Sequence, residues 1–352
     1  MRLNEIKRVL SEILFFRNTL KMYGEVLKKG KYVIFPSMRA MVVDDKTSYD
    51  TAKRYFHKNL PKSYRVFLVN KLNAIGFFRN NRKSVQNYEA FYVANNYDKV
   101  RETKLFSFER KKILTICANS EDYLNQIKWH KDKHSFYNMP RIEENRKYKN
   151  SYEISMIDLL SRPGEEQALD NILCSVMREN EQKNDNLRLE VSEIIKFDYE
   201  NKEMKVILDN ISSHISPEIL SLCIPLCEQH GDLSRDNLIY GQENEKTDFW
   251  WIDWEHLGNR MFLYDYFFYI FNTAVYFKDK MSFDFYINGR HNEKLKKYFN
   301  FFGIEFSENN LKDYFLVFVM EFLKERVCDL DNLIALKMYN NFLNELGLLE
   351  KI

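Results

Sequence analysis

Apolar residues change their spacing partway along this chain. Residues Thr103–Glu109 alternate between apolar and polar types, and Ile113–Ala118 forms a second apolar run after the polar cluster Glu109–Lys112. This pattern predicts a β-hairpin. Beyond Leu187 the apolar residues recur mainly at three and four positions, which predicts helices. A strand-rich part followed by a helix-rich part predicts an α+β fold with two lobes.

The predicted elements divide the chain into three parts. A helical extension covers residues 1–35, a strand-rich lobe covers residues 36–160, and a helical lobe covers residues 161–352. Helical spacing, capping residues and short apolar runs bounded by polar clusters support this division. The individual predictions are helices over Met1–Gly30, Ser120–Tyr137 and Glu165–Arg178, and strands over Tyr32–Phe35, Arg65–Val69 and Tyr152–Leu160.

Composition excludes several classes of protein. Apolar residues make up 45% of the 352 residues, too many for a disordered chain, and 10 glycines and 6 prolines are too few for a linker-rich one. The five cysteines are scattered, so neither a disulfide framework nor a zinc site is predicted. The most apolar stretch, Met261–Phe277, contains Asp265, and the first ten residues lack the apolar run of a signal peptide. We therefore expect a soluble, cytoplasmic protein.

The net charge of +2 conceals two halves of opposite sign. Residues 1–150 contain 32 Lys and Arg against 15 Asp and Glu, whereas residues 151–352 contain 21 against 36. A basic half favours an anionic ligand such as a nucleotide, or contact with an anionic membrane surface; alternatively, the two halves simply attract each other. No nucleic-acid-binding motif accompanies the basic half, so no nucleic-acid partner is predicted.

One segment, residues 230–255, holds the residue types of a phosphoryl-transfer site. It contains two short apolar runs separated by the polar residues 241–248, which predicts another β-hairpin. Such a hairpin brings Asp232 and Asn237, before the first strand, close to Asp253, after the second. Phosphoryl transfer needs a carboxylate that accepts the proton of the attacking hydroxyl, and Mg²⁺ that neutralises the phosphates. We therefore predict Asp232 as the base and Asn237 and Asp253 as Mg²⁺ ligands, because oxygen donors suit this ion.

The same segment resembles the catalytic region of the aminoglycoside phosphotransferase and choline kinase families, which are relatives of the protein kinases. His230-Gly231-Asp232 with Asn237 is similar to their catalytic loop, Ile252-Asp253-Trp254-Glu255 to their metal-binding motif, and Tyr264-Asp265 to a downstream element whose Asp buttresses the site. The resemblance implies a protein-kinase-like two-lobed fold, ATP as phosphate donor, Mg²⁺, and structural support of the site by Asp265. We expect His230 to fix the loop backbone rather than to titrate.

The basic half departs from these families. They carry a phosphate-anchoring Lys on the strand that corresponds to Ile113–Ala118, and this strand has none. Lys112 lies just before it and is the predicted phosphate contact, while Lys104 lies on the preceding strand. The turn at Glu109–Lys112 contains no glycine, so a backbone cradle for phosphates is not predicted there. By analogy of position, adenine is expected against Ile157–Leu160.

Two functions are compatible with these features. The first is an ATP-dependent kinase that transfers the γ-phosphate to a hydroxyl of an aminoglycoside, an amino alcohol or a sugar, including a cell-envelope polysaccharide precursor; the acidic half suits a cationic acceptor. The second is a kinase-like binding or regulatory protein that has lost activity, because the strand Lys and the glycines are missing. The basic helix at residues 1–30 either packs on the protein or contacts a membrane surface peripherally.

Overall fold

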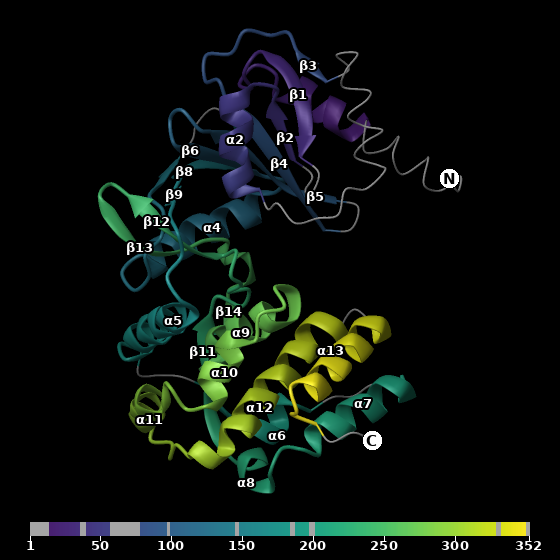
Figure 1. The fold of residues 1–352 in the computed structure, drawn as a ribbon, viewed down its shortest axis with the longest axis vertical. Coiled ribbons are helices and arrows are strands. Elements are labelled where there is room, and N and C mark those ends of the chain that lie inside the picture. Colours follow the sequence, from purple (N-terminus) through teal and green to yellow (C-terminus); the bar gives the residue numbers. More distant parts are fainter. Residues whose placement is uncertain are drawn as a thin grey trace. The chain divides into compact units, whose positions relative to one another are not determined.

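The structure is a computed structural model that describes residues 14–35, 40–56, 78–96, 99–144, 148–183, 187–196, 201–328 and 332–349. The chain forms two compact units, whose elements are labelled in Figure 1. Unit 1 comprises Met1–Asp132, Met139–Ser161 and Tyr240–Asp248, and unit 2 comprises Lys133–Asn138, Arg162–Ile239 and Phe249–Ile352. The predicted α+β fold class is confirmed, since unit 1 is built on a large sheet and unit 2 is mainly helical.

Unit 1 contains an eight-stranded antiparallel sheet in the order β3-β1-β2-β4-β5-β6-β8-β7. The predicted hairpin is present as β5 and β6, with Leu105 opposite Leu114. The strands are β1 (Gly30–Phe35), β2 (Ala40–Val43), β3 (Arg79–Asn80), β4 (Ala90–Asn96), β5 (Lys99–Ser107), β6 (Lys112–Cys117), β7 (Ile142–Glu144) and β8 (Ser151–Ser155).

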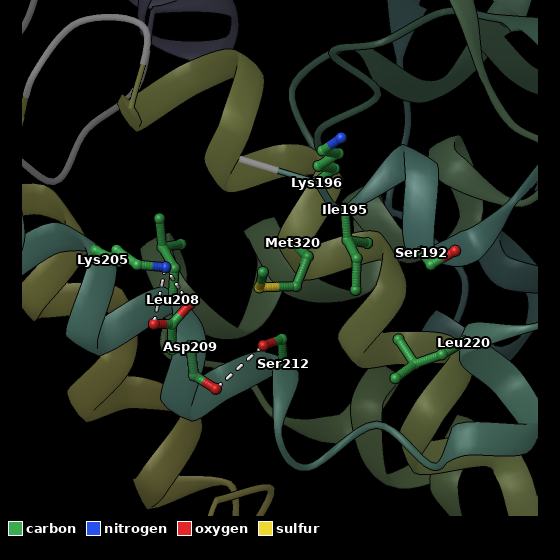
Figure 2. Close-up of a pocket in the computed structure, with 9 residues that line it drawn as sticks. All are labelled: Ser192, Ile195, Lys196, Lys205, Leu208, Asp209, Ser212, Leu220 and Met320. Atoms are coloured by element: carbon green, nitrogen blue, oxygen red, sulfur yellow. Dashed lines mark hydrogen bonds and ion pairs between the residues drawn. The ribbon is translucent and has the colours of Figure 1, made fainter. Parts of the chain in front are cut away.

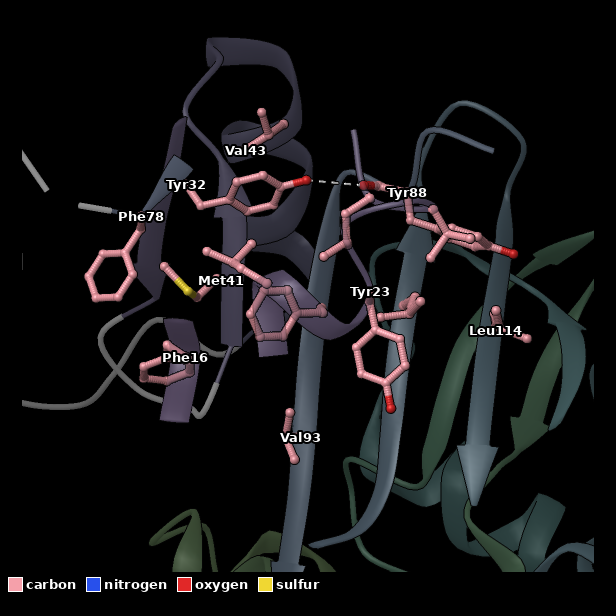
Figure 3. Packing of buried hydrophobic residues seen from close by; sticks show 14 residues of the cluster. Phe16, Tyr23, Tyr32, Met41, Val43, Phe78, Tyr88, Val93 and Leu114 are labelled. Carbon is pink, nitrogen blue, oxygen red and sulfur yellow. Dashed lines mark hydrogen bonds between the residues drawn. The ribbon is translucent and has the colours of Figure 1, made fainter. Parts of the chain in front are cut away.

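Alternate residues of each strand point to opposite faces of the sheet, so both faces can carry apolar side chains. Helices pack on both of these faces. On one face, Leu114 of β6 belongs to a buried cluster with Phe16 of the helix at residues 14–22 (Figure 3). On the other face, α2 (Lys46–Tyr55) packs against the strands through a second buried cluster. The described part of the N-terminal helix therefore buries apolar residues against the sheet, and a peripheral membrane contact through this helix stays a prediction.

The predictions for the N-terminal end meet the structure only in part. The strand predicted over Tyr32–Phe35 is confirmed as β1, and Tyr32 lies opposite Val43 of β2. This pairing places the end of the predicted helical extension inside the sheet. The strand predicted over Arg65–Val69 and the first 13 residues of the predicted helix lie outside the described residues.

Helix α4 covers Ser120–Lys133. Ser120, the predicted start, is the first helical residue, and the side chain of Asn119 before it accepts a backbone N–H of the first turn at 2.8 Å. The helix ends before the predicted end at Tyr137. The physical reason is that Lys133 and Tyr137 are both buried in unit 2, where packing overrides the helical pattern.

Unit 2 is mainly helical and has an aromatic core. Phe267 contacts Phe315, and Phe271 contacts Phe318, with the rings edge to face, so that the core holds α9 against α12. These two helices support the site described below. The helices are α5 (Glu165–Asn180), α6 (Val191–Ile194), α7 (Lys202–Ser212), α8 (Pro217–Leu220), α9 (Tyr264–Tyr276), α10 (Met281–Ile287), α11 (Asn292–Phe301), α12 (Leu311–Leu323) and α13 (Leu333–Glu345).

The described residues also form two smaller sheets. One contains β10 (Arg188–Glu190), β11 (Cys223–Gln229) and β14 (Gly258–Met261), and the other contains β9 (Asp158–Leu159), β12 (Leu238–Glu243) and β13 (Lys246–Trp251). The hairpin predicted in residues 230–255 is confirmed as β12 and β13. None of the described helices combines the length and the apolar character that crossing a bilayer requires.

Candidate active site

Two loops of unit 2 meet at the base of the β12–β13 hairpin. The N–H of Ile252 donates to the carbonyl oxygen of Asn237 at 3.0 Å, so Asp253, the next residue, lies beside Asn237. The side-chain Nδ2 of Asn237 donates to the carbonyl oxygen of Asp232 at 2.8 Å and lies 3.4 Å from the Asp232 carboxylate. The structure therefore brings together Asp232, Asn237 and Asp253, as the hairpin prediction requires.

His230 joins the two loops from inside the protein. Its Nε2 donates to the carbonyl oxygen of Ile252 at 2.8 Å, and its Nδ1 accepts the N–H of Asp232 at 3.3 Å. This pair of bonds requires the neutral imidazole with its proton on Nε2. Burial lowers the pKa of His230 to about 4, which keeps the ring neutral at physiological pH. The residue thus holds the loop backbone, as expected from the sequence.

Asp265, in the first turn of α9, holds the same loop. Its carboxylate accepts the N–H of His230 at 2.6 Å with one oxygen and the N–H of Gly231 at 2.8 Å with the other. Asp265 is fully buried in the first turn of α9, and burial raises its pKa to about 6 although both backbone bonds favour the ionised form. The carboxylate therefore sets the position of the two residues that precede Asp232.

Left-handed backbone conformations occur on both sides of this contact. Gly231 has φ +79°, and a Cβ at this position would lie 2.3 Å from the carbonyl oxygen of His256, so only glycine fits. Asp253 has φ +63° and ψ 62° at the end of β13, where it precedes a short 3₁₀ turn, Trp254–His256. A non-glycine residue held in this region is uncommon, and such strain clusters at functional sites.

Charged neighbours of both signs surround Asp232. Its side chain is 36% exposed and lies 3.9 Å from the guanidinium Nη2 of Arg326. Partial burial raises the pKa of Asp232; Arg326 and His256 oppose the shift, whereas Asp253 and Glu255 add to it. A carboxylate with a raised pKa is a stronger base than an ordinary one. Sequence reasoning missed Arg326, because 95 residues separate it from Gly231 and it belongs to no motif.

Two arginines hold the remainder of the loop. Arg235 pairs with Glu165 and lies 3.4 Å from the carboxylate of Asp279, so it is a structural anchor rather than a solvated side chain. Arg162 donates to the carbonyl oxygen of Arg235 at 3.2 Å and to that of Leu238 at 2.8 Å. Residues 232–238 are therefore fixed at both ends, which limits the positions that Asp232 and Asn237 can take.

Lys112, the predicted phosphate contact, lies in unit 1, as does Lys104. Lys112 pairs with Glu143 at 2.5 Å and lies 3.8 Å from Glu153. Lys104, on the neighbouring strand β5, pairs with Glu102 of the same strand at 2.9 Å, and its side chain is only 16% exposed. Both lysines are thus engaged with carboxylates in this structure, and the phosphate role of Lys112 stays a prediction.

The connection after β8 also has partners within unit 1. The hydroxyl of Tyr55 in α2 donates to the carbonyl oxygen of Ile157 at 2.9 Å, and burial raises the pKa of this tyrosine to about 12, so it stays a donor. The N–H of Leu160 donates to the carbonyl oxygen of Tyr240 at 3.1 Å. The adenine position predicted against Ile157–Leu160 stays a prediction. Helix α2 contacts this segment through Tyr55.

Unit 2 also contains a cavity of about 250 Å³ between α6, α7, α8 and α12 (Figure 2). The ion pair of Lys205 with Asp209, at 3.1 Å, lies on its wall. None of the predicted site residues lines this cavity. Its lining consists of Ser192, Ile195, Lys196, Lys205, Leu208, Asp209, Ser212, Leu220 and Met320.

Comparisons with known proteins give a structural likeness. No family model and no curated protein matches the chain. Among solved structures, the chain is similar to an amicoumacin kinase in complex with AMP-PNP and Ca²⁺. The identity is 13%, the likeness covers 71% of this chain and 86% of that one, and the TM-score is 0.43.

Two further structures are similar over a comparable length. The aminoglycoside phosphotransferase APH(4)-Ia is 10% identical, with 72% of this chain and 93% of that one covered and a TM-score of 0.45. A choline/ethanolamine kinase family protein from Mesorhizobium loti is 14% identical, with 74% and 88% covered and a TM-score of 0.38.

Proposed function

We propose that this protein is a phosphotransferase that moves the γ-phosphate of ATP to a hydroxyl group of a small molecule. Asp232 is the base, and Asn237 and Asp253 are the Mg²⁺ ligands. The observation that carries the proposal is their convergence at the base of one hairpin, with the backbones of Asp232 and Ile252 tied together by a neutral, buried His230. This is the geometry that phosphoryl transfer needs, because catalysis there consists of positioning and charge stabilisation.

The donor set fits Mg²⁺. Asp253 offers a carboxylate, and Asn237 offers an amide oxygen, since its Nδ2 is already directed at Asp232. Among the described residues, no group of three His, Cys, Asp or Glu side chains forms a metal site of its own. That agrees with an ion held by one or two protein ligands, with nucleotide phosphates and water completing the shell. Bound Mg²⁺ would neutralise charge on the phosphates.

The transfer step follows from these roles. The acceptor hydroxyl attacks the γ-phosphorus, its proton passes to the Asp232 carboxylate, and a new O–P bond forms. The bond between the γ-phosphorus and the bridging oxygen breaks, and ADP leaves with that electron pair. For the acceptor, we favour a cationic molecule such as an aminoglycoside or an amino alcohol, because residues 151–352 carry 36 acidic against 21 basic side chains; a sugar is the neutral alternative.

One observation favours a second function, that of a kinase-like binding protein without activity. The hydroxyl of Tyr55 already occupies the carbonyl oxygen of Ile157, in the connection where adenine is expected. A nucleotide base has to displace this contact before it can bind there. Nucleotide binding and turnover therefore separate the two functions.

Incubation with γ-labelled ATP, Mg²⁺ and a panel of aminoglycosides, amino alcohols and sugars tests the proposal. We expect label to move to at least one acceptor, and Asp232→Asn to lower that transfer by about 1,000-fold because the base is lost. Asp236→Asn is the matched control, since Asp236 is an exposed carboxylate on the same loop. Absence of transfer from the wild-type protein to every acceptor, or equal loss in both variants, would contradict the proposal.

A further inference from the structure

The C-terminal end of α12 reaches the loop that carries Asp232. At Lys324 the helix passes into a π-helical turn, Lys324–Cys328, which contains Arg326. Turns of this kind are rare and occur frequently at functional sites. The extra residue in the turn changes the direction of the side chains that follow, which is how a residue at the end of an otherwise buried helix can be aimed at a loop.

Arg326 contacts both loops of the proposed site. Its Nη2 donates to the carbonyl oxygen of Gly231 at 2.8 Å and lies 3.9 Å from Oδ1 of Asp232. Its Nη1 lies 3.3 Å from Nε2 of His256, in the turn that follows Asp253. One planar guanidinium therefore connects the loop before the base with the segment after the metal ligand, which a single-point cation could not do.

The guanidinium of Arg326 lies close to the carboxylate of Asp232 without a hydrogen bond to it. At 3.9 Å the guanidinium is close enough to Asp232 for a charge interaction but too far for a hydrogen bond. The side chains of Arg326 and Asp232 are 25% and 36% exposed, so both reach solvent. Asp232 is thus oriented by a neighbouring cation while its oxygens stay available to an incoming hydroxyl.

The π turn itself is firmly held. Glu325, the residue before Arg326, accepts Nε of Arg260 at 2.9 Å. The guanidinium of Arg260 lies over the ring of Tyr264, 5.0 Å from its centroid, at the start of α9. Arg326 is therefore presented by a segment anchored to the same helix whose Asp265 holds His230 and Gly231.

We propose that Arg326 is a positioning residue for phosphoryl transfer, which holds Gly231 and Asp232 in register with the turn after Asp253. This inference rests on the proposed function and adds to it a residue from outside the motif region. Because misplacement of a catalytic group by about 1 Å costs about 100-fold in rate, loss of this contact should act mainly on turnover. Nucleotide binding depends on other residues and should change little.

The test uses the full chain with Arg326→Ala, Arg326→Lys and the control Arg290→Ala. Arg290 pairs with Glu166 at 3.2 Å in the same unit and is 53% exposed, so it matches the charge lost without touching the site. For Arg326→Ala we expect kcat to fall about 100-fold, while the Kd for Mg-ATP stays within about threefold of wild type. Guanidinium chloride added at millimolar concentration to Arg326→Ala should restore part of kcat. The kcat of Arg326→Lys should lie between those of Arg326→Ala and wild type.

A second measurement reads positioning without turnover. Hydrogen–deuterium exchange in residues 229–238 should become about tenfold faster in Arg326→Ala and stay unchanged in Arg290→Ala. A wild-type kcat in Arg326→Ala, or a fall in kcat that guanidinium does not rescue and a matching loss of Mg-ATP affinity, would overturn the inference. If the wild-type protein transfers no phosphate but exchange still rises, the proposed function fails while the positioning contact stands. Unchanged exchange together with absent transfer would overturn both.

Discussion

Replacing Asp265 with Asn tests how this carboxylate holds the loop that carries the proposed base, Asp232. The two carboxylate oxygens accept the N–H groups of His230 and Gly231 at 2.6 and 2.8 Å, and the side chain is fully buried. Asparagine has the same size but only one accepting oxygen, so its NH₂ group must face one of the two N–H groups. The substitution therefore removes the charge and leaves one buried donor without an acceptor.

The expected cost can be worked out from these contacts. A hydrogen bond to a charged acceptor contributes about 1.5–3 kcal/mol, whereas a neutral one contributes about 0.5–1.5 kcal/mol. A buried donor without a partner adds about 1–3 kcal/mol. After allowance for rearrangement of the loop, we expect Asp265→Asn to lower the free energy of unfolding by about 3 kcal/mol, a large part of the about 5–15 kcal/mol typical of a protein domain.

Equilibrium unfolding in urea at pH 8 measures this cost, because the carboxylate with a pKa of about 6 is then ionised. Trp251 and Trp254 report on the unfolding by fluorescence, since both rings pack around His230 in unit 2. Asp313→Asn is the control. Its carboxylate accepts a single backbone N–H, from Ser216 at 3.0 Å, so the expected cost is about 1 kcal/mol.

The comparison between the two variants decides whether the reasoning holds. A cost below about 1 kcal/mol for Asp265→Asn, or a cost equal to that of Asp313→Asn, would show that the paired N–H contacts do not hold the loop.

Three further predictions concern single residues. Because burial lowers the pKa of His230 from 6.5 to about 4, the unfolded chain binds the proton more tightly than the folded one. As the pH falls from 6.5 to 4, the free energy of unfolding of wild type should therefore fall by about 3 kcal/mol relative to that of His230→Gln. A difference between the two proteins that stays constant with pH in urea unfolding would contradict this. Gly231→Ala should destabilise the protein by about 2 kcal/mol or more in thermal unfolding, since its Cβ would lie 2.3 Å from a carbonyl oxygen; Gly164→Ala, with nothing within 4 Å, should be nearly neutral, and equal effects would refute the clash. Lys112→Gln should weaken Mg-ATP binding in calorimetry by about tenfold and Lys104→Gln by less, because Lys112 is the predicted phosphate contact and a cation–phosphate hydrogen bond is charge-assisted; the reverse order would contradict this choice.

The sequence predicted the centre of the site because its signals are local. Asp232, Asn237 and Asp253 flank two apolar runs joined by a polar loop, and strand pairing alone brings them together. Asp265 was recognisable as a carboxylate in an otherwise apolar helix, which requires partners when buried. In this part of the chain, short-range patterns and tertiary packing agree.

Residues contributed by distant elements could not be predicted. Arg326, Arg162 and Glu165 reach the loop from 70 to 95 residues away, and their positions depend on how α5, α9 and α12 pack. The ion pair of Lys112 with Glu143 depends on the register of β6, β8 and β7, which the sequence does not specify. The sequence likewise predicts helices where β10, β11 and β14 lie, and this prediction is wrong because strands of three to seven residues give weak periodicity.

Nucleotide binding and phosphate transfer depend on different residues of the proposed site, Asp253 and Asp232. Calorimetric titration with Mg-ATP, combined with acceptor phosphorylation, is carried out on wild type, Asp232→Asn and Asp253→Ala. We expect Asp232→Asn to keep Mg-ATP affinity within about threefold while losing transfer, and Asp253→Ala to lose the Mg²⁺-dependent part of binding. Unchanged Mg-ATP affinity in Asp253→Ala, or undiminished transfer by Asp232→Asn, would contradict this expectation.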